Sequence, residues 1–197
     1  VIAWGEDGGG GTMDITPANR QNIYNSIVAC MNKGFDGYSD DIEGYVGSHQ
    51  QWIDYINNCT AVLHGLGKLL MPAVGFDWQQ NTNQYLHVDY ILSMFYSSTS
   101  KFEDPQGPYY WQEDFGEYNG HNTPPASPMI IGIMNFYGSS IGGTNANPLS
   151  WQLAQCSNYL AAYGHPQLEG FCIWVYEYMN VNAPVWSAWD NWIMRVG

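Results

Sequence analysis

Apolar runs alternate along this chain with segments that have the spacing of amphipathic helices. The runs expected to be strands lie at about residues 1–4, 35–43, 69–76, 88–96, 129–137 and 170–178. Most of them are apolar on both faces, which is typical of parallel strands that are buried on both sides and connected by helices. The pattern therefore predicts the α/β class.

The first helix is expected to start at Thr16, as N-cap, followed by Pro17, and to end at Gly34. A second helix is expected to start after Ser48, with Trp52 and neighbouring apolar residues on its buried face. Further helical segments are expected near residues 83–87, 148–163 and 186–196.

The order of elements favours a (β/α)8 TIM-barrel-like fold. No G-x-G-x-x-G opens a helix after the first strand, which argues against a dinucleotide-binding sheet. A complete barrel typically needs about 250 residues, and aligning the first run to the third barrel strand leaves no sequence for the first two. We therefore expect residues 1–197 to form a single domain that contains the third to eighth strands. A second chain or a missing segment would then complete the barrel at the exposed first strand.

The longest predicted loop, residues 97–128, is rich in aromatic residues, including Trp111. Loops of this length are usually functional lids or disordered, and the aromatic content argues against disorder. Its aromatic side chains either stack on sugar rings or form a small core of their own beneath the loop.

The net charge of the chain argues against several classes of binding partner. The chain has 5 Lys and Arg against 18 Asp and Glu, a formal net charge of −13, so nucleic acid and anionic membranes would be repelled. No apolar run reaches the ~20 residues of a membrane span. The four cysteines and five histidines lack metal-ligand spacing, so neither a metal nor another cofactor is expected, and the cysteines are either structural pairs or buried thiols. The composition favours a secreted, extracellular protein.

The segment from Gly34 to Tyr45 concentrates carboxylates beside apolar residues. If it is a barrel strand, Ser39, Asp41 and Glu43 face the barrel interior, because residues of equal parity share a face. Crowded carboxylates in a pocket of low dielectric constant separate in pKa, as glycoside hydrolysis requires. The alternative is a solvated acidic turn.

This segment resembles the D-G-x-D-x-D-x-E motif of family 18 glycoside hydrolases, the chitinases and related endo-β-N-acetylglucosaminidases. Residues 36–43 match it at Asp36, Gly37, Asp41 and Glu43, and Ser39 replaces an Asp. Two later segments also resemble family motifs: residues 94–96 its M-x-Y, and residues 170–174 its last strand with a Gly and a Trp.

The resemblance implies hydrolysis of β-linked N-acetylglucosamine polymers or glycans by a substrate-assisted, retaining mechanism. Glu43 would protonate the glycosidic oxygen, Asp41 would stabilise the oxazolinium intermediate, and Tyr96 would hydrogen-bond the acetamido oxygen. The floor of the subsite would be Trp174. Further substrate contacts are expected from Asp36, Trp78, Trp111 and Tyr137.

Two departures from the motif leave a rival interpretation open, namely a non-catalytic carbohydrate-binding or structural extracellular protein on the same scaffold. Ser39 removes a carboxylate that tunes Asp41 in the family. Asp40 stands where the family has an apolar residue facing the helices, and a charge there is costly unless it is paired or exposed. Lys33 or Arg20 is expected to pair with it.

Overall fold

The computed structural model of the chain describes residues 1–6, 12–42, 44–75, 82–94, 125–134, 157 and 168–174. The described strands are β1 (Ile2–Glu6), β2 (Met13–Asp14), β3 (Gly37–Asp41), β4 (Tyr45–Val46), β5 (Leu69–Leu70), β6 (Ala73–Gly75), β7 (Ile91–Met94), β8 (Met129–Met134) and β9 (Leu168–Trp174). The described helices are α1 (Arg20–Met31), α2 (His49–His64) and the 3-10 helix η1 (Thr82–Tyr85). Every run that was expected to be a strand contains one, which confirms the α/β class.

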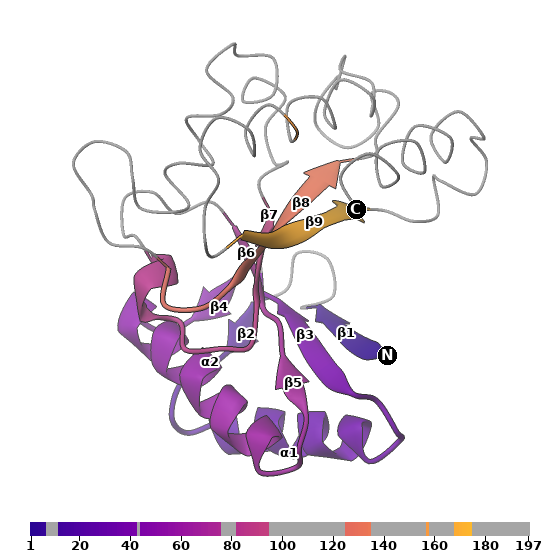
Figure 1. Cartoon of the computed structure of the whole chain (residues 1–197). Coiled ribbons are helices and arrows are strands. Elements are labelled where there is room, and N and C mark those ends of the chain that lie inside the picture. The colour runs from indigo at the N-terminus through magenta and orange to yellow at the C-terminus, as the bar shows by residue number, and fades with distance from the viewer. Residues whose placement is uncertain are drawn as a thin grey trace.

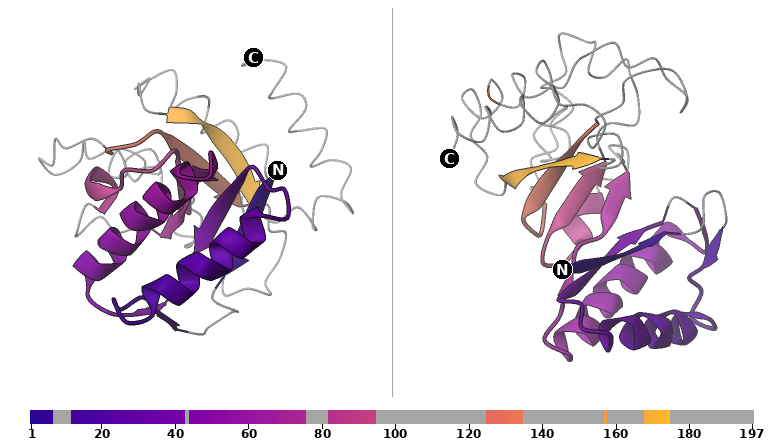
Figure 2. Two further views of the ribbon diagram at one scale, coloured as in Figure 1. Left: turned by 90° about the horizontal axis from the view of Figure 1, so that it is seen from below. Right: turned by 90° about the vertical axis from the view of Figure 1, so that its right-hand side faces the viewer.

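The main sheet is parallel. Its order is β1-β3-β6-β7-β8-β9, with β5 also paired to β3, and β2 and β4 form a separate parallel pair. Among the described residues the sheet is open, with β1 and β9 at its two ends. Helices α1 and α2 lie side by side against one face of β1, β3 and β5 (Figures 1 and 2).

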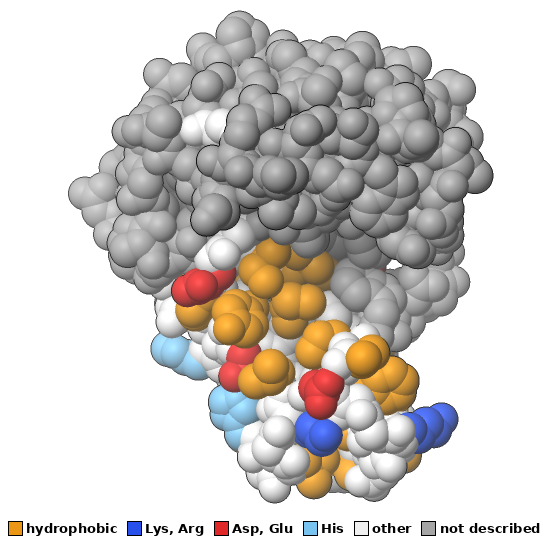
Figure 3. Space-filling view, turned by 45° about the vertical axis from the view of Figure 1, so that its right-hand side comes forward, with side chains coloured by type: hydrophobic (Ala, Val, Ile, Leu, Met, Phe, Trp, Pro, Cys, Tyr) orange, Lys and Arg blue, Asp and Glu red, His pale blue; other side chains and the backbone are white. Residues whose placement is uncertain are grey.

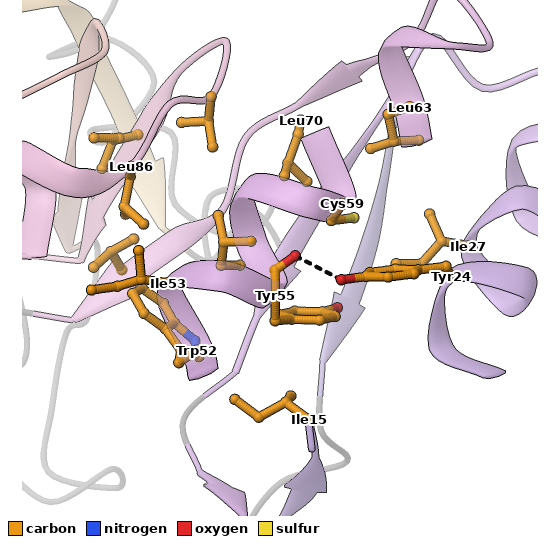
Figure 4. Packing of buried hydrophobic residues seen from close by; sticks show 14 of the residues in the cluster. Ile15, Tyr24, Ile27, Trp52, Ile53, Tyr55, Cys59, Leu63, Leu70 and Leu86 are labelled. Atoms are coloured by element: carbon orange, nitrogen blue, oxygen red, sulfur yellow. Dashed lines mark hydrogen bonds between the residues drawn. The ribbon is translucent and has the colours of Figure 1, made fainter. Parts of the chain in front are cut away.

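The core lies between these two helices and the sheet. Residues of α1 and α2 pack there against residues of the strands, including Ala3, Leu70, Val74 and Ile91. Figure 4 shows the part of this core around Tyr55, which is fully buried. A second, smaller cluster joins Ala73 and Leu92 to Met71 and Ile130 on the other face of the sheet.

The start of the first helix was predicted wrongly. Helix α1 begins at Arg20, with Asn19 as its N-cap, and not at Thr16. The hydroxyl of Thr16 donates to Asp14 Oδ1 at 2.6 Å, and its carbonyl accepts from Asn19 in a preceding turn, so its side chain does not cap the helix. At α2 the prediction is confirmed, because Ser48 and Gln51 form a reciprocal capping box.

The surface of this part of the protein carries little charge on the side shown in Figure 3, where hydrophobic side chains gather and only a few acidic and basic side chains appear. The large hydrophobic residues that are exposed in the described region are Val1, Val46, Leu66, Leu69 and Tyr85. No described helix is long and apolar enough to cross a membrane.

Candidate functional site

The acidic segment forms β3, in the interior of the parallel sheet. Asp41, its last residue, pairs in register with Glu6 at the end of β1 and with Ala73 at the start of β6. Its side chain is only 5% exposed, and Ser39 on the same face is 0% exposed. Since side chains alternate along a strand, Ser39 and Asp41 share the face of Ala73 and its small apolar cluster. The predicted parity is confirmed for these two residues, while Glu43 lies outside the described residues.

Most of the other predicted site residues follow the carboxyl ends of neighbouring strands in the sequence. Trp78 comes three residues after β6, Tyr96 two residues after β7 and Tyr137 three residues after β8. These three residues and Trp111 lie outside the described residues. Trp174 is the last residue of β9, and its backbone lies at the same edge of the parallel sheet as Asp41. The structure does not describe its side chain.

Asp36 lies at the opposite end of β3. It precedes the strand, whereas Asp41 ends it, and at ~3.3 Å per residue their Cα atoms are about 16 Å apart. The carboxylate of Asp36 is exposed and accepts a hydrogen bond from the backbone nitrogen of Val1. The structure therefore does not bring Asp36 together with Asp41.

Ser39 takes up a backbone interaction instead of extending the acidic cluster. Its hydroxyl donates to the carbonyl oxygen of Met71 at 2.7 Å and so ties β3 to the segment between β5 and β6. A carboxylate could not make this hydrogen bond, because an ionised Asp has no donor. Serine at this position therefore strengthens the sheet and leaves Asp41 without a neighbouring carboxylate two residues earlier on its face.

Glu6 is a candidate that the sequence interpretation missed. The first run was expected to end at about residue 4, before Glu6, but β1 continues to Glu6, and the Cα atom of Glu6 is the register partner of Asp41. Two acidic residues thus occupy adjacent positions on neighbouring strands, at the carboxyl edge of the sheet. Only the pairing of β1 with β3 reveals this, because the two residues are far apart in the sequence.

Asp40 faces the helices, as expected, but its predicted pairing with Lys33 or Arg20 is wrong. It is 1% exposed, and its Oδ2 accepts a hydrogen bond from the hydroxyl of Tyr55 at 2.7 Å. The Tyr38 hydroxyl lies 3.5 Å from Oδ1. Lys33 is exposed, and Arg20 donates from Nε to the carbonyl oxygen of Ile15. Neutral hydroxyl groups, and not a cation, therefore satisfy this carboxyl group.

Burial raises the pKa of Asp40 to about 7. The hydrogen bonds from Tyr55 and Tyr38 oppose this rise because they favour the carboxylate, whereas the charge of Asp41 adds to it. Burial also raises the pKa values of Tyr55 and Tyr38, and the nearby Asp40 contributes to both shifts. Both phenols thus remain hydrogen-bond donors while Asp40 titrates.

Tyr55 is held in place by α1. Its ring stacks on Tyr24 with centroids 5.6 Å apart and an angle of 6° between the ring planes. The hydroxyl of Tyr24 donates to the carbonyl oxygen of Tyr55 at 3.1 Å (Figure 4). Cys59, one turn further along α2, is buried, and Cys30 of α1 is half-buried; both are free cysteines. These two cysteines are therefore thiols and not structural pairs.

The chain that leaves β3 is anchored directly after Glu43. The carbonyl oxygen of Gly44 accepts from the backbone of Met13, and Tyr45 stacks on Trp52 of α2 with centroids 6.2 Å apart. His49 also stacks on Trp52, and its Nε2 lies 3.1 Å from the Thr82 hydroxyl of η1. This aromatic group, which the sequence interpretation did not single out, fixes the path of the acidic segment as it enters α2.

No group of three or more His, Cys, Asp or Glu side chains suited to a metal occurs among the described residues. What the described part of the site offers is one buried carboxylate at the strand end, Asp41, with a second carboxyl group behind it, Asp40. Such a pair can supply negative charge near a developing cation, and its two members are in different environments.

No protein-family model matches the chain, and no curated protein matches it. Solved structures do. A chitinase from Chromobacterium violaceum ATCC 12472 aligns with a TM-score of 0.67 and 17% identity over 98% of this chain and 78% of its own. The spore cortex-lytic enzyme SleL of Bacillus megaterium QM B1551 aligns with a TM-score of 0.59 and 9% identity over 88% of this chain and 55% of its own.

A third structure, the candidate sporulation-specific glycosylase ydhD of Bacillus subtilis, aligns with a TM-score of 0.51 and 19% identity. That alignment covers 67% of this chain, which spans half the length of its counterpart. At these identities the likeness is one of fold: the chain has a fold similar to that of a chitinase, a spore cortex-lytic enzyme and a candidate sporulation-specific glycosylase.

Proposed function

We propose that this protein is a glycoside hydrolase, similar to family 18, that cleaves β-linked N-acetylglucosamine polymers or glycans on a TIM-barrel-like scaffold. The observation that carries the proposal is the buried carboxylate of Asp41 at the carboxyl end of β3, two residues before Glu43, in a chain with the fold of a chitinase. Catalytic residues of (β/α)8 barrels lie at this end of the strands.

In the proposed mechanism Glu43 donates its proton to the glycosidic oxygen as the bond to the anomeric carbon breaks. The acetamido carbonyl of the same sugar attacks that carbon and forms an oxazolinium ion, which water then opens while Glu43 takes back a proton. Asp41 supplies the negative charge that stabilises this cation, and its burial strengthens the interaction because water screens it little. Tyr96 orients the acetamido group and Trp174 supports the sugar ring.

The test compares two substrates that differ only in the participating group. The protein is expected to hydrolyse β-1,4-linked N-acetylglucosamine oligomers and to leave glucose oligomers of equal length intact, because these lack the acetamido nucleophile. The Asp41→Asn variant is expected to lose about 10²-fold or more in kcat, the usual size of such an electrostatic contribution. Equal turnover of both substrates would reject the substrate-assisted mechanism.

One observation favours a second candidate function, carbohydrate binding without turnover. Ser39 commits its hydroxyl to Met71, so the carboxylate found there in family 18 has no equivalent at this position. A protein of this kind would bind the N-acetylglucosamine oligomer and release it uncleaved, which calorimetry beside product analysis would show.

The setting and partners of the enzyme are part of the same proposal. We place it outside the cell, where such polymers occur, and expect a further segment or a second chain to pair with β1. Support comes from the position of β1 at one end of the described sheet and from the chitinase alignment, which covers 78% of that chain. Crosslinking from β1 tests this proposal: a crosslink to a further segment or to a second chain would support it, and the absence of such a crosslink would contradict it.

A further inference from the structure

The carboxyl group of Asp40 has no part in the mechanism proposed above, although Asp40 is only 1% exposed. Its two hydrogen-bond partners come from different elements, Tyr55 from α2 and Tyr38 from β3 itself. Tyr55 is in turn fixed by stacking on Tyr24 of α1. Both helices therefore hold the back of the strand whose front carries Asp41.

There is little free space around the Asp40 carboxyl group and its partner Tyr38. A Cβ atom on Gly5 of β1 would lie only 1.9 Å from the hydroxyl oxygen of Tyr38. Glycine at position 5, the register partner of Asp40, is thus what leaves room for the Tyr38 hydroxyl. An apolar residue in place of Asp40 would leave the hydroxyl groups of Tyr55 and Tyr38 without this acceptor, so the three polar groups form one unit.

We propose that Asp40 is a positioning residue for the proposed active site: hydrogen-bonded behind β3 by Tyr55 and Tyr38, it fixes the strand that carries Asp41 and couples activity to its own ionisation. The proposal rests on the proposed function. It adds a titrating group on the helix side of the strand, where the resemblance implies an apolar one.

The coupling has a physical basis in burial. Asp40 and Asp41 are successive residues, and the charge of Asp41 contributes to the raised pKa of Asp40, so ionisation of Asp40 acts on Asp41 in return. The titratable groups that act on Asp40 are Asp41 and Tyr38 on its own strand and Tyr55 on α2. The charge of Asp40 in turn contributes to the raised pKa values of Cys59 on α2 and Tyr24 on α1. The ion pairs between described residues, such as that of His64 with Asp89, do not include Asp40.

The sign of the effect follows from the pKa of about 7. Below neutral pH the group is protonated, the Tyr55–Asp40 contact is between neutral groups, and the strand carries the charge of Asp41 without a second one behind it. Above neutral pH a second negative charge is buried behind Asp41, which disturbs the charge balance of the site. Activity is therefore expected to fall as Asp40 ionises.

The test compares the pH profiles of kcat/KM for wild type, Asp40→Asn and Asp54→Asn on an N-acetylglucosamine oligomer. Asn keeps the shape of Asp40 and an acceptor for Tyr55 but cannot ionise. The ratio of Asp40→Asn to wild type is expected to rise from pH 5 to pH 8 by up to about tenfold, since one inactivating ionisation costs tenfold per pH unit above its pKa. The control, Asp54→Asn at a half-buried position of α2 whose carboxylate accepts from Gln50, is expected to keep the wild-type profile. An unchanged ratio across this range overturns the proposal.

A second measurement does not depend on catalysis. In the wild type the carboxyl carbon resonance of Asp41 is expected to show a step near neutral pH as Asp40 ionises, and Asp40→Asn is expected to remove that step. In Tyr55→Phe, which lacks a hydrogen bond favouring the carboxylate, the step is expected at higher pH, whereas Tyr85→Phe on the exposed face of η1 is expected to leave it in place. If the wild type shows the step but cleaves no oligomer, the proposed function fails and the coupling stands. If the step is absent, the coupling fails whatever the activity.

Discussion

At the scale of single residues, neighbouring positions of β3 have opposite roles. Ser39 and Asp41 face the small inner cluster, while Asp40 faces the helices. The alternation was predictable from the strand period, but the partners were not. Tyr55 lies 15 residues from Asp40 and Met71 lies 32 residues from Ser39, and such contacts depend on how α2 and the next strand pack.

The stability of the protein is expected to depend on pH through Asp40. Its pKa is raised from an unfolded value of ~3.9 to about 7 in the folded protein, so the folded state holds the proton more tightly between these values. Its contribution to stability is therefore greatest below about pH 4, falls as pH rises to about 7, and then levels off. Relative to wild type, Asp40→Asn is expected to gain up to about 4 kcal/mol between pH 4 and pH 8, at 1.36 kcal/mol per pKa unit. Urea unfolding at the two pH values measures this, and a constant difference would contradict it.

Gly5 is expected to tolerate no side chain. In Gly5→Ala the new Cβ would overlap the Tyr38 hydroxyl and force that ring away from Asp40. Overpacking of this kind typically costs about 1–3 kcal/mol. Gly170→Ala in β9 is the matched control, because a Cβ there meets no atom within 4 Å. Equal stability of the two variants in thermal unfolding would show that Tyr38 moves without cost.

At the scale of elements, the sequence predicted strands better than helix ends. Buried parallel strands are marked by their own apolar residues, so their positions could be read locally. The start of α1 could not be predicted locally, because Thr16 and Pro17 have the residue types of an N-cap and a first helical position. In the structure the Thr16 hydroxyl instead donates to Asp14, which lies on β2, the strand paired with β4. At α2 Ser48 and Gln51 bond to each other's backbone in the capping box, and the predicted start is confirmed.

Loss of the α2 cap is expected to destabilise the element that holds Tyr55. Ser48→Ala removes the acceptor for the Gln51 backbone amide, 3.2 Å away, and such changes cost about 1 kcal/mol. Ser26→Ala, an exposed position within α1 whose hydroxyl donates to a backbone carbonyl of the same helix, is expected to change stability by less than about half as much. Denaturant midpoints of the two variants check this order, and a larger loss in Ser26→Ala would contradict it.

At the scale of the whole molecule, the parallel sheet with helices on one face and the likeness to a chitinase structure agree with the expected scaffold. The acidic edge of the sheet could be located from the sequence because strand ends and acidic residues coincide at Asp41. Glu6 could not be assigned to that edge, since only the register between β1 and β3 puts it beside Asp41. Where Tyr96, Trp78, Trp111 and Tyr137 lie remains a prediction.

The measurement that tests the central claim most directly is hydrolysis of a fluorogenic N-acetylglucosamine oligomer by wild type, Glu43→Gln and Glu169→Gln, from about pH 3 to pH 7. Glu169 lies exposed in β9 and serves as the control for loss of one carboxylate. The account predicts turnover by wild type and Glu169→Gln and a loss of at least about 10²-fold in Glu43→Gln, the contribution of a general acid. Equal turnover by wild type and Glu43→Gln would contradict it.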